Sequence, residues 1–378
     1  MSQAIELIRE LSDAGASPKA TIAKSMKETG KEAFGCFPIY VPEEIIYAAG
    51  YLPVGLWGGH PDIKRVDRYI QSFCCSIMRS NMEMGIRGDY DFLAGLVIPT
   101  YCDSMKAILA NWWVAVPNAK PIPFSVIQNR ASKGSLDFVL AQLATFRKAV
   151  GELRGEPVSD QAIEDAFALY EDYRAAMRAF TKAAARVPAT ITPTLRHLII
   201  KAAYYIDKKV YTEKIKALNE ALAAMPEERT EGPKVIVTGL LAEPESFLDL
   251  FTENGYAFMG DDLAQESRQF RTEARKEGTA LERMAYRVLD QRGDTFYYED
   301  DKSRGTMLKN MVKETGSDAV VVCMYKFCDP EEFDYPVYKK ELDEAGIPIL
   351  YLEIEQKMDS VESLRTRIQS FAEMLSLS

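Results

Sequence analysis

The sequence lacks the features expected of a membrane protein, a secreted protein or a nucleic-acid-binding protein. No apolar run approaches the ~18 residues that a membrane span requires. The first residues, MSQAIELIRELSDAG, are typical of an amphipathic helix rather than of a signal peptide. A formal net charge of −10 leaves no broad basic surface to neutralise phosphates. We therefore expect a cytoplasmic protein that binds neither membranes nor nucleic acids.

Most sequence motifs for nucleotides and metals are missing as well. GLWGGHPD is a glycine-rich turn after a strand, but it matches neither GxGxxG nor a Walker A loop. No CxxC pair exists, so zinc-ribbon and thioredoxin-like sites have no support. Histidine is limited to His60, in that loop, and His197, in a helical basic stretch expected at the surface or in packing. A cysteine hydrolase would therefore depend on His60 as its base.

Apolar runs and helical patterns alternate at both ends of the chain, which predicts a parallel sheet covered by helices in each half. Between them the sequence is charged and helix-periodic. We expect an α/β protein with two similar Rossmann-like or flavodoxin-like parallel-sheet domains, residues 1–135 and 231–378, joined by a helical segment, residues 136–230. The strand candidates are residues 51–57, 93–99 and 120–127 in the first half and 234–241, 256–262, 319–327 and 347–354 in the second.

Six cysteines are present, and three of them stand where a cofactor needs ligands. Cys102 and Cys328 each follow a strand candidate and precede an aspartate, and Cys75 opens or lies within a helix. Sites on parallel sheets form at the carboxyl ends of strands. Thiolates there favour soft metals and iron–sulfur clusters. The alternatives are a nucleophilic thiol or small buried apolar side chains.

A second group of residues, Asp261 to Arg271, combines acids and arginines directly after a strand candidate. Arg268 and Arg271 are candidates for binding phosphate or carboxylate groups of a ligand. The alternative is a solvated helix start with charge pairs along one face.

Five segments together resemble the 2-hydroxyacyl-CoA dehydratase family, and in particular the smaller, β, subunit of these heterodimers. The resemblance covers nearly the whole chain and includes the 2-hydroxyglutaryl-, 2-hydroxyisocaproyl-, phenyllactyl- and lactoyl-CoA enzymes; benzoyl-CoA reductase subunits are more distant. The segments are GCFPIYVPEEIIYAAGYLPVG at 35–55, SFCCSIMRS at 72–80, IPTYCDSM at 98–105, DDLAQESRQF at 261–270 and FCDPEEFDYP at 327–336.

The resemblance implies a [4Fe–4S] cluster in each subunit, ligated in this chain by Cys75, Cys102 and Cys328. One iron is then left for a ligand other than these thiolates. Cys36, in the GCFP segment, is expected behind the ligands or as an occasional fourth one. Cys323 is expected in the core. The resemblance also implies a flavin in some holoenzymes, although no flavin site is visible in this sequence.

The implied reaction is the oxygen-sensitive, syn-type removal of water from an (R)-2-hydroxyacyl-CoA to give the (E)-2-enoyl-CoA, as in anaerobic amino-acid fermentation. One added electron gives a ketyl radical anion that expels the 2-hydroxyl, after which the β-proton is far more acidic and the electron is recovered. The implied partners are a larger homologous α subunit, which mainly binds the acyl-CoA, and an ATP-dependent iron–sulfur activator. The alternatives are a subunit of an aryl-CoA reductase of the benzoyl-CoA type and a non-catalytic, cluster-carrying electron-transfer protein.

Overall fold

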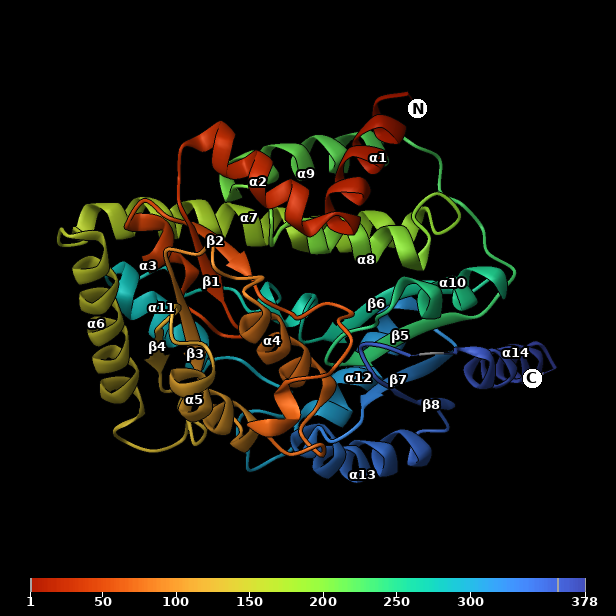
Figure 1. Ribbon diagram of the computed structural model, residues 1–378. Coiled ribbons are helices and arrows are strands. Elements are labelled where there is room, and N and C mark those ends of the chain that lie inside the picture. Colours follow the sequence, from red (N-terminus) through yellow and green to blue (C-terminus); the bar gives the residue numbers. More distant parts are fainter. Residues whose placement is uncertain (1, 359, 378) are drawn as a thin grey trace.

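Two four-stranded parallel sheets form the framework of the computed structural model, which describes residues 2–358 and 360–377 (Figure 1). Their strand orders are β2-β1-β3-β4 and β6-β5-β7-β8, so the second half repeats the order of the first. This is the order of flavodoxin-like folds, and the predicted fold class is confirmed. The strands are β1 (Ala33–Cys36), β2 (Leu52–Gly55), β3 (Gly95–Pro99), β4 (Pro121–Phe124), β5 (Lys234–Gly239), β6 (Ala257–Leu263), β7 (Ala319–Tyr325) and β8 (Ile349–Ile354).

Strand β1 is the one strand that the sequence did not predict. It is short, contains Gly35 and shows no apolar alternation, yet it lies between β2 and β3 with every residue buried. A Cβ atom at Gly35 would come within 2.6 Å of Leu56 and 2.8 Å of Leu93, so the close packing here requires glycine. The edge strand β4 tolerates Pro121 and Pro123, as edge strands do.

Helices cover both faces of each sheet, as the alternating pattern predicted. The first half contains α3 (Glu43–Ala48), η1 (Val66–Arg68), α4 (Ser76–Arg87) and α5 (Asp103–Ala115). The second half contains α10 (Glu245–Glu253), η2 (Ser267–Gln269), α11 (Ala280–Leu289), α12 (Arg304–Thr315), α13 (Asp329–Glu344) and α14 (Glu362–Ser376).

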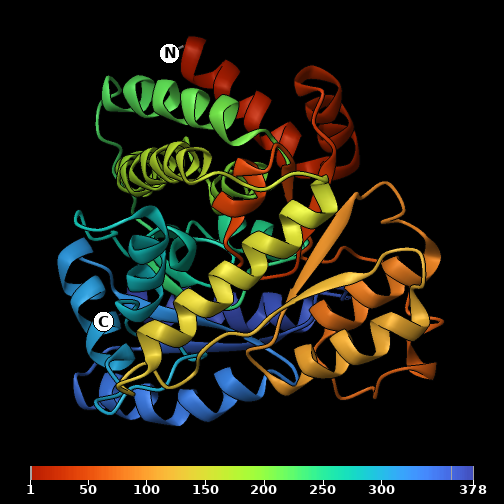
Figure 2. The ribbon, with the colours of Figure 1, turned by 90° about the vertical axis from the view of Figure 1, so that its left-hand side faces the viewer.

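A layer of helices lies over both halves, at the top of Figures 1 and 2. Its long helix α7 follows the N-cap residue Ser159, whose side chain accepts a hydrogen bond from the N–H of Ala162 at 3.1 Å. Helix α1 packs against α8 and α9 in this layer, and Leu11 shares its apolar core with Met177 and Tyr211. The proposed domain boundaries stay a prediction. The helices of this layer are α1 (Ser2–Ala16), α2 (Pro18–Thr29), α7 (Asp160–Arg186), α8 (Pro193–Ala202) and α9 (Lys208–Ala223), whereas α6 (Ser135–Arg154) runs down the side of the first half and contacts α3, α11 and β4 (Figure 1).

The two halves share one apolar core instead of meeting only at a linker. A single cluster of buried side chains includes Leu52 and Leu96 from the first sheet and Val235 and Val321 from the second. This junction determines where the two sets of strand ends face each other. No helix in the described part of the chain is long and apolar enough to cross a membrane.

Candidate functional site

A cavity of about 340 Å³ lies between the halves, at the carboxyl ends of strands from both sheets. This is the position at which parallel α/β sheets bind ligands. The predicted residues Cys75, Cys102 and Cys328 all line it, and we call it the cysteine cavity. The residues that follow strand ends and line it are Pro38 and Ile39 after β1, Cys102 after β3, Leu240 after β5, Ala264 after β6 and Cys328 after β7.

Each of the three cysteines is the N-cap residue of a helix. Cys75 precedes α4, Cys102 precedes α5 and Cys328 precedes α13. A helix N-terminus carries a partial positive charge and free peptide N–H groups, so it stabilises a nearby anion. Three such termini therefore converge on one cavity, and all three favour sulfur in its thiolate form.

Burial opposes thiolate formation at the same three residues. Burial raises the pKa of Cys75 to about 12 and that of Cys102 to about 11, and it raises the pKa of Cys328 well above its ordinary value. At Cys102, hydrogen bonds from the peptide N–H groups of Met105 and Ser104 lower the pKa and so oppose part of the effect of burial. Cys75 and Cys102 also raise the pKa of Cys328 through their charges, so the three sulfurs are mutual neighbours. Only a cationic partner in the cavity would keep all three as thiolates.

The other three cysteines lie elsewhere. Cys36 is in β1, in the core beneath α3 and α6, and its electrostatic neighbours are Glu43 and Lys208. Cys74 is buried next to Cys75 but does not line the cysteine cavity. Cys323 is buried within β7, as expected of a core residue. The structure therefore separates the three predicted ligands from Cys36, which the sequence placed near them.

Neither His60 nor His197 lines the cysteine cavity. The Nδ1 atom of His60 lies 2.6 Å from the backbone oxygen of Gln356, and the ring lines a different cavity. His197, expected at the surface or in packing, is buried between Glu243 and Glu266, at 3.1 and 2.9 Å. Burial acts to lower the pKa of His197, but the two carboxylates outweigh it and the pKa is raised. This geometry does not support a Cys/His hydrolase.

Aromatic residues that the sequence did not single out close the cysteine cavity. Tyr101 is buried beside Cys102, donates a hydrogen bond to the oxygen of Pro38 at 2.7 Å and packs edge-on against Phe296 at 4.7 Å. The backbone beside the cavity is strained, because Ile39 and Phe327 have φ values of 57° and 61°. Strained backbone at a cavity wall in both halves is typical of a site held in a fixed shape.

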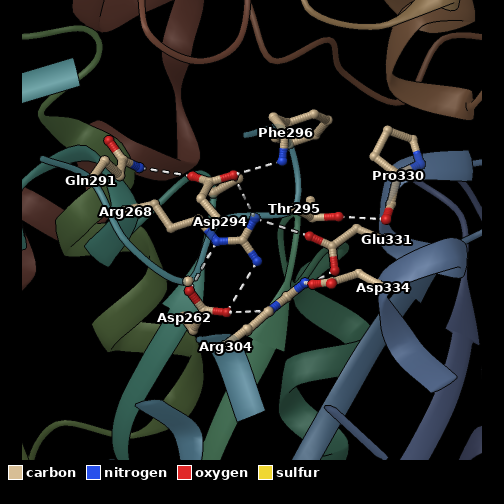
Figure 3. Close-up of polar contacts among 12 residues, drawn as sticks. Asp262, Arg268, Gln291, Asp294, Thr295, Phe296, Arg304, Pro330, Glu331 and Asp334 are labelled. Atoms are coloured by element: carbon tan, nitrogen blue, oxygen red, sulfur yellow. Dashed lines mark hydrogen bonds and ion pairs between the residues drawn. The ribbon is translucent and has the colours of Figure 1, made fainter. Parts of the chain in front are cut away.

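Beneath Cys328 lies a buried group of charges, shown in Figure 3, which we call the ionic cluster. Arg268 is 1% exposed, donates to Asp262 at 2.9 and 3.1 Å and lies 2.9 Å from a Glu331 oxygen. Burial acts to raise the pKa of Asp262, but Arg268 and its neighbouring arginines lower it overall. The ionic cluster consists of Asp262, Arg268, Asp294, Arg304, Glu331 and Asp334.

Both interpretations of the arginines drawn from the sequence are wrong. Arg268 and Arg271 bind Asp262 of this chain, so their hydrogen-bonding groups face a protein carboxylate rather than a ligand. Asp261 and Asp262 lie at the end of β6, not on a solvated helix. The acids and arginines of this segment instead form a buried ion-pair site, which also includes a third arginine, Arg304, from distant sequence.

The donor atoms of the cysteine cavity fit an iron–sulfur cluster. Across residues 2–358 and 360–377, no three His, Cys, Asp or Glu side chains are arranged to hold one ion. Cys75, Cys102 and Cys328 instead line a space of about 340 Å³. An iron–sulfur cluster is ligated by thiolates and spreads them over separate iron atoms. The donor atoms, the enclosed space and the helix N-termini all fit such a group.

Comparison with known proteins identifies a family. Residues 38–375 match the family described as 2-hydroxyglutaryl-CoA dehydratase, D-component. The chain is 38% identical to the (R)-phenyllactyl-CoA dehydratase beta subunit of Clostridium sporogenes and 39% identical to the lactoyl-CoA dehydratase subunit beta of Anaerotignum propionicum, over 99% of this chain and 100% of each relative. It is 36% identical to the (R)-2-hydroxyglutaryl-CoA dehydratase subunit beta of Acidaminococcus fermentans, over 98% of this chain and 99% of that protein. A benzoyl-CoA reductase subunit from Thauera aromatica is more distant, at 24% identity over 94% of this chain and 95% of that protein.

Proposed function

The chain belongs to the 2-hydroxyglutaryl-CoA dehydratase D-component family, and we propose that it is the β subunit of an oxygen-sensitive (R)-2-hydroxyacyl-CoA dehydratase. The observation that carries the proposal is the convergence of Cys75, Cys102 and Cys328 on one cavity, each at the start of a helix. Three relatives named as β subunits of such dehydratases match nearly the full length of this chain. Their names support a heterodimer with an α subunit.

We assign a [4Fe–4S] cluster to the cysteine cavity, with Cys75, Cys102 and Cys328 as its ligands. When bound, such a cluster supplies one-electron chemistry at low potential. The chain's own contribution is to orient the thiols, to favour their thiolate forms through three helix N-termini and to exclude water with Tyr101 and Phe296. Cys36, Cys74 and Cys323 lie outside the cavity, so the proposal leaves the fourth iron to a ligand other than a cysteine of this chain.

In the proposed reaction the α subunit binds the acyl-CoA and the β subunit holds and returns the electron. A proton at C3 of a 2-hydroxyacyl-CoA is not acidic, because it is β to the thioester. One electron added to the thioester carbonyl gives a ketyl radical anion, which loses hydroxide; the enoxy radical then loses the C3 proton and finally returns the electron. The sum is the loss of one water molecule with no net consumption of electrons.

The initial electron must come from another protein, and we propose a separate ATP-dependent iron–sulfur activator. The sequence contains no Walker A loop with which this chain could hydrolyse ATP itself. The acyl group of the substrate is set by the partner in this proposal, because the cavity in this chain is lined mainly by the thiols and by apolar side chains.

The test is the ratio of ATP consumed to product formed by the anaerobic α/β pair with activator, ATP and a low-potential reductant. A dehydratase should complete many turnovers after the activator is removed, because the electron is recycled. A fixed ratio of ATP to product, with a reduced acyl-CoA as product, would instead establish the aryl-CoA reductase alternative. Turnover without activator or reductant would contradict the radical reaction.

A further inference from the structure

Glu331 connects the ionic cluster to the Cys328 sulfur. The residue lies in the first turn of α13 and is 1% exposed. Its carboxylate oxygens lie 2.9 Å from Arg268 and 2.8 Å from Arg304. After burial, the negative charge of Glu331 is the strongest influence that raises the pKa of Cys328, and the peptide N–H of Glu331, which faces the Cys328 sulfur, acts in the opposite direction. The same residue is therefore fixed by two arginines at its side chain and faces the thiol with its backbone.

The two arginines are themselves held rigidly. Arg304 donates to Asp262 at 2.9 Å and to the hydroxyl of Thr238 at 2.8 Å, while Arg268 binds the same Asp262 (Figure 3). Asp262 ends β6 and Thr238 lies in β5, so the anchor of Glu331 is the sheet itself. Through Glu331, the start of α13 is tied to β5 and β6 rather than only to its own strand β7.

A neighbouring contact acts on the same turn. The hydroxyl of Thr295 donates to the backbone oxygen of Pro330, next to Glu331. The adjacent Asp294 accepts from the peptide N–H of Phe296 at 3.0 Å, and Phe296 is a wall of the cysteine cavity. The ionic cluster thus supports both the turn that carries Cys328 and the aromatic wall beside it.

We propose that Glu331 is a positioning residue that fixes Cys328 in the cysteine cavity, with Arg268 and Arg304 as its anchors. The proposal rests on the proposed function, because it concerns a ligand of the cluster assigned there. A carboxylate is required, because a neutral side chain would remove one of the two buried carboxylates, Asp262 and Glu331, that the guanidinium groups of Arg268 and Arg304 share. Glu331 acts on the assigned [4Fe–4S] cluster indirectly, through the geometry and the electrostatics of Cys328.

Asp334 offers a matched control on the same helix. It lies 3.0 Å from the same Arg304, but its side chain is 14% exposed and it is one turn farther from Cys328. Asp334→Asn and Glu331→Gln each remove one negative charge from the ionic cluster. If the ionic cluster contributes only to the stability of the fold, the two substitutions should change the alkylation rate of Cys328 equally.

The first experiment measures the alkylation of individual cysteines by iodoacetamide in the iron-free α/β pair, followed by peptide mass spectrometry. Cys328 is 5% exposed and should react slowly in the wild type. Glu331→Gln should accelerate its alkylation about tenfold, because it frees the first turn of α13 and removes a charge that raises the pKa of Cys328, with Cys102 unchanged. Asp334→Asn should stay within about twofold of the wild type.

The second experiment records iron content and the midpoint potential of the bound cluster in the same proteins. Glu331→Gln should lower iron retention and move the potential to less negative values, because a negative charge near Cys328 is removed. Glu331→Asp keeps the charge and should restore the potential in part. Asp334→Asn should leave both readouts close to those of the wild type.

Equal acceleration of Cys328 alkylation in Glu331→Gln and Asp334→Asn, or acceleration in neither, would overturn the inference. If Glu331→Gln does not fold, Glu331→Asp decides: it keeps the negative charge but shortens the reach to Arg268 and Arg304, and Cys328 alone should react faster. An unchanged rate in that variant contradicts the proposal. A wild-type pair that binds no iron would refute the proposed function, while the alkylation rates would still test the role of Glu331.

Discussion

The two halves of the chain share a strand order but supply the cysteine cavity with different side chains. In both halves a cysteine follows the third strand and caps the next helix, Cys102 before α5 and Cys328 before α13. The helix before that strand differs. In the first half it is α4, which Cys75 caps, whereas in the second it is α12, which begins at Arg304 after Ser303.

The first half therefore provides two thiols and the second half provides one thiol with an ionic support. Arg304 occupies the place in the second half that corresponds to the start of α4 in the first, and its partners hold the turn that bears Cys328. In our proposal both halves supply ligands, and the second half in addition positions its own ligand, Cys328. The substitutions that follow test this difference between the two halves.

The largest effect is expected when a cavity thiol is removed from either half. Cys75→Ala, Cys102→Ala and Cys328→Ala should each lose most of the iron bound by the anaerobically purified α/β pair, because each removes a thiolate ligand. Iron analysis and the visible absorption of the brown protein provide the measurement. Cys323→Ala should keep its iron. Full retention of iron in the three cavity variants would contradict the assignment of these cysteines as ligands.

The second prediction compares the two halves by the effect of a substitution on the free energy of unfolding rather than on iron content. Arg268→Met should lower the free energy of unfolding of the iron-free protein by about 3–5 kcal/mol, because it removes a buried cation that pairs with both Asp262 and Glu331. Cys75→Ala in the first half should cost only about 1 kcal/mol. Urea unfolding followed by circular dichroism measures both. Similar costs for the two variants would contradict the distinction between ligation and support.

The pH dependence of stability provides a third test, at Asp294 in the ionic cluster. Burial raises the pKa of Asp294 to about 7 in the folded protein, above the value of about 4 expected when unfolded. The protonated form therefore stabilises the fold below about pH 4, and this contribution is lost as the pH rises to about 7. Relative to the wild type, Asp294→Asn should gain stability over that interval, on the order of a few kcal/mol. Parallel stability profiles from pH 4 to pH 8 would show that Asp294 is ionised throughout.

The smallest effect concerns Asp103 and Asp329, which follow the equivalent cysteines and line the cavity from opposite halves. Both carboxylates raise the pKa of Cys102, after burial, so both lie near its sulfur. Asp103→Asn and Asp329→Asn should each shift the cluster potential slightly to less negative values, with a smaller shift at high salt because exposed charges are screened. Redox titration followed by electron paramagnetic resonance gives the shift. A change in only one variant would show that the two positions are not equivalent.

The sequence predicted the part of the site that depends on strand ends. Cys102 and Cys328 were located because the carboxyl ends of parallel strands meet at one edge, and the apolar runs before them are unambiguous. Cys36 was expected near them from the family resemblance of the GCFP segment, and β1, in which it lies, was not predicted. Within a strand, successive side chains point to opposite faces, so Cys36 faces the core under α3 instead of the strand ends.

Local sequence patterns could not predict the ionic cluster. Asp262 pairs with Arg268 nearby but also with Arg304, and Glu331 joins both from another helix. Such pairs depend on the tertiary fold, whereas an acid-and-arginine run in sequence is equally typical of a solvated helix. The wall formed by Tyr101 and Phe296 was missed for the same reason, because the two rings come from different halves.

The central claim is that thiols from both halves hold one cluster, and locating the iron tests it most directly. Anomalous diffraction at the iron edge, on anaerobically grown crystals of the α/β pair, would place the metal. We predict iron density in this chain within the cavity bounded by Cys75, Cys102 and Cys328. Iron bound to Cys36 or at another place in the chain, or a fully loaded pair with no iron in this subunit, would contradict it.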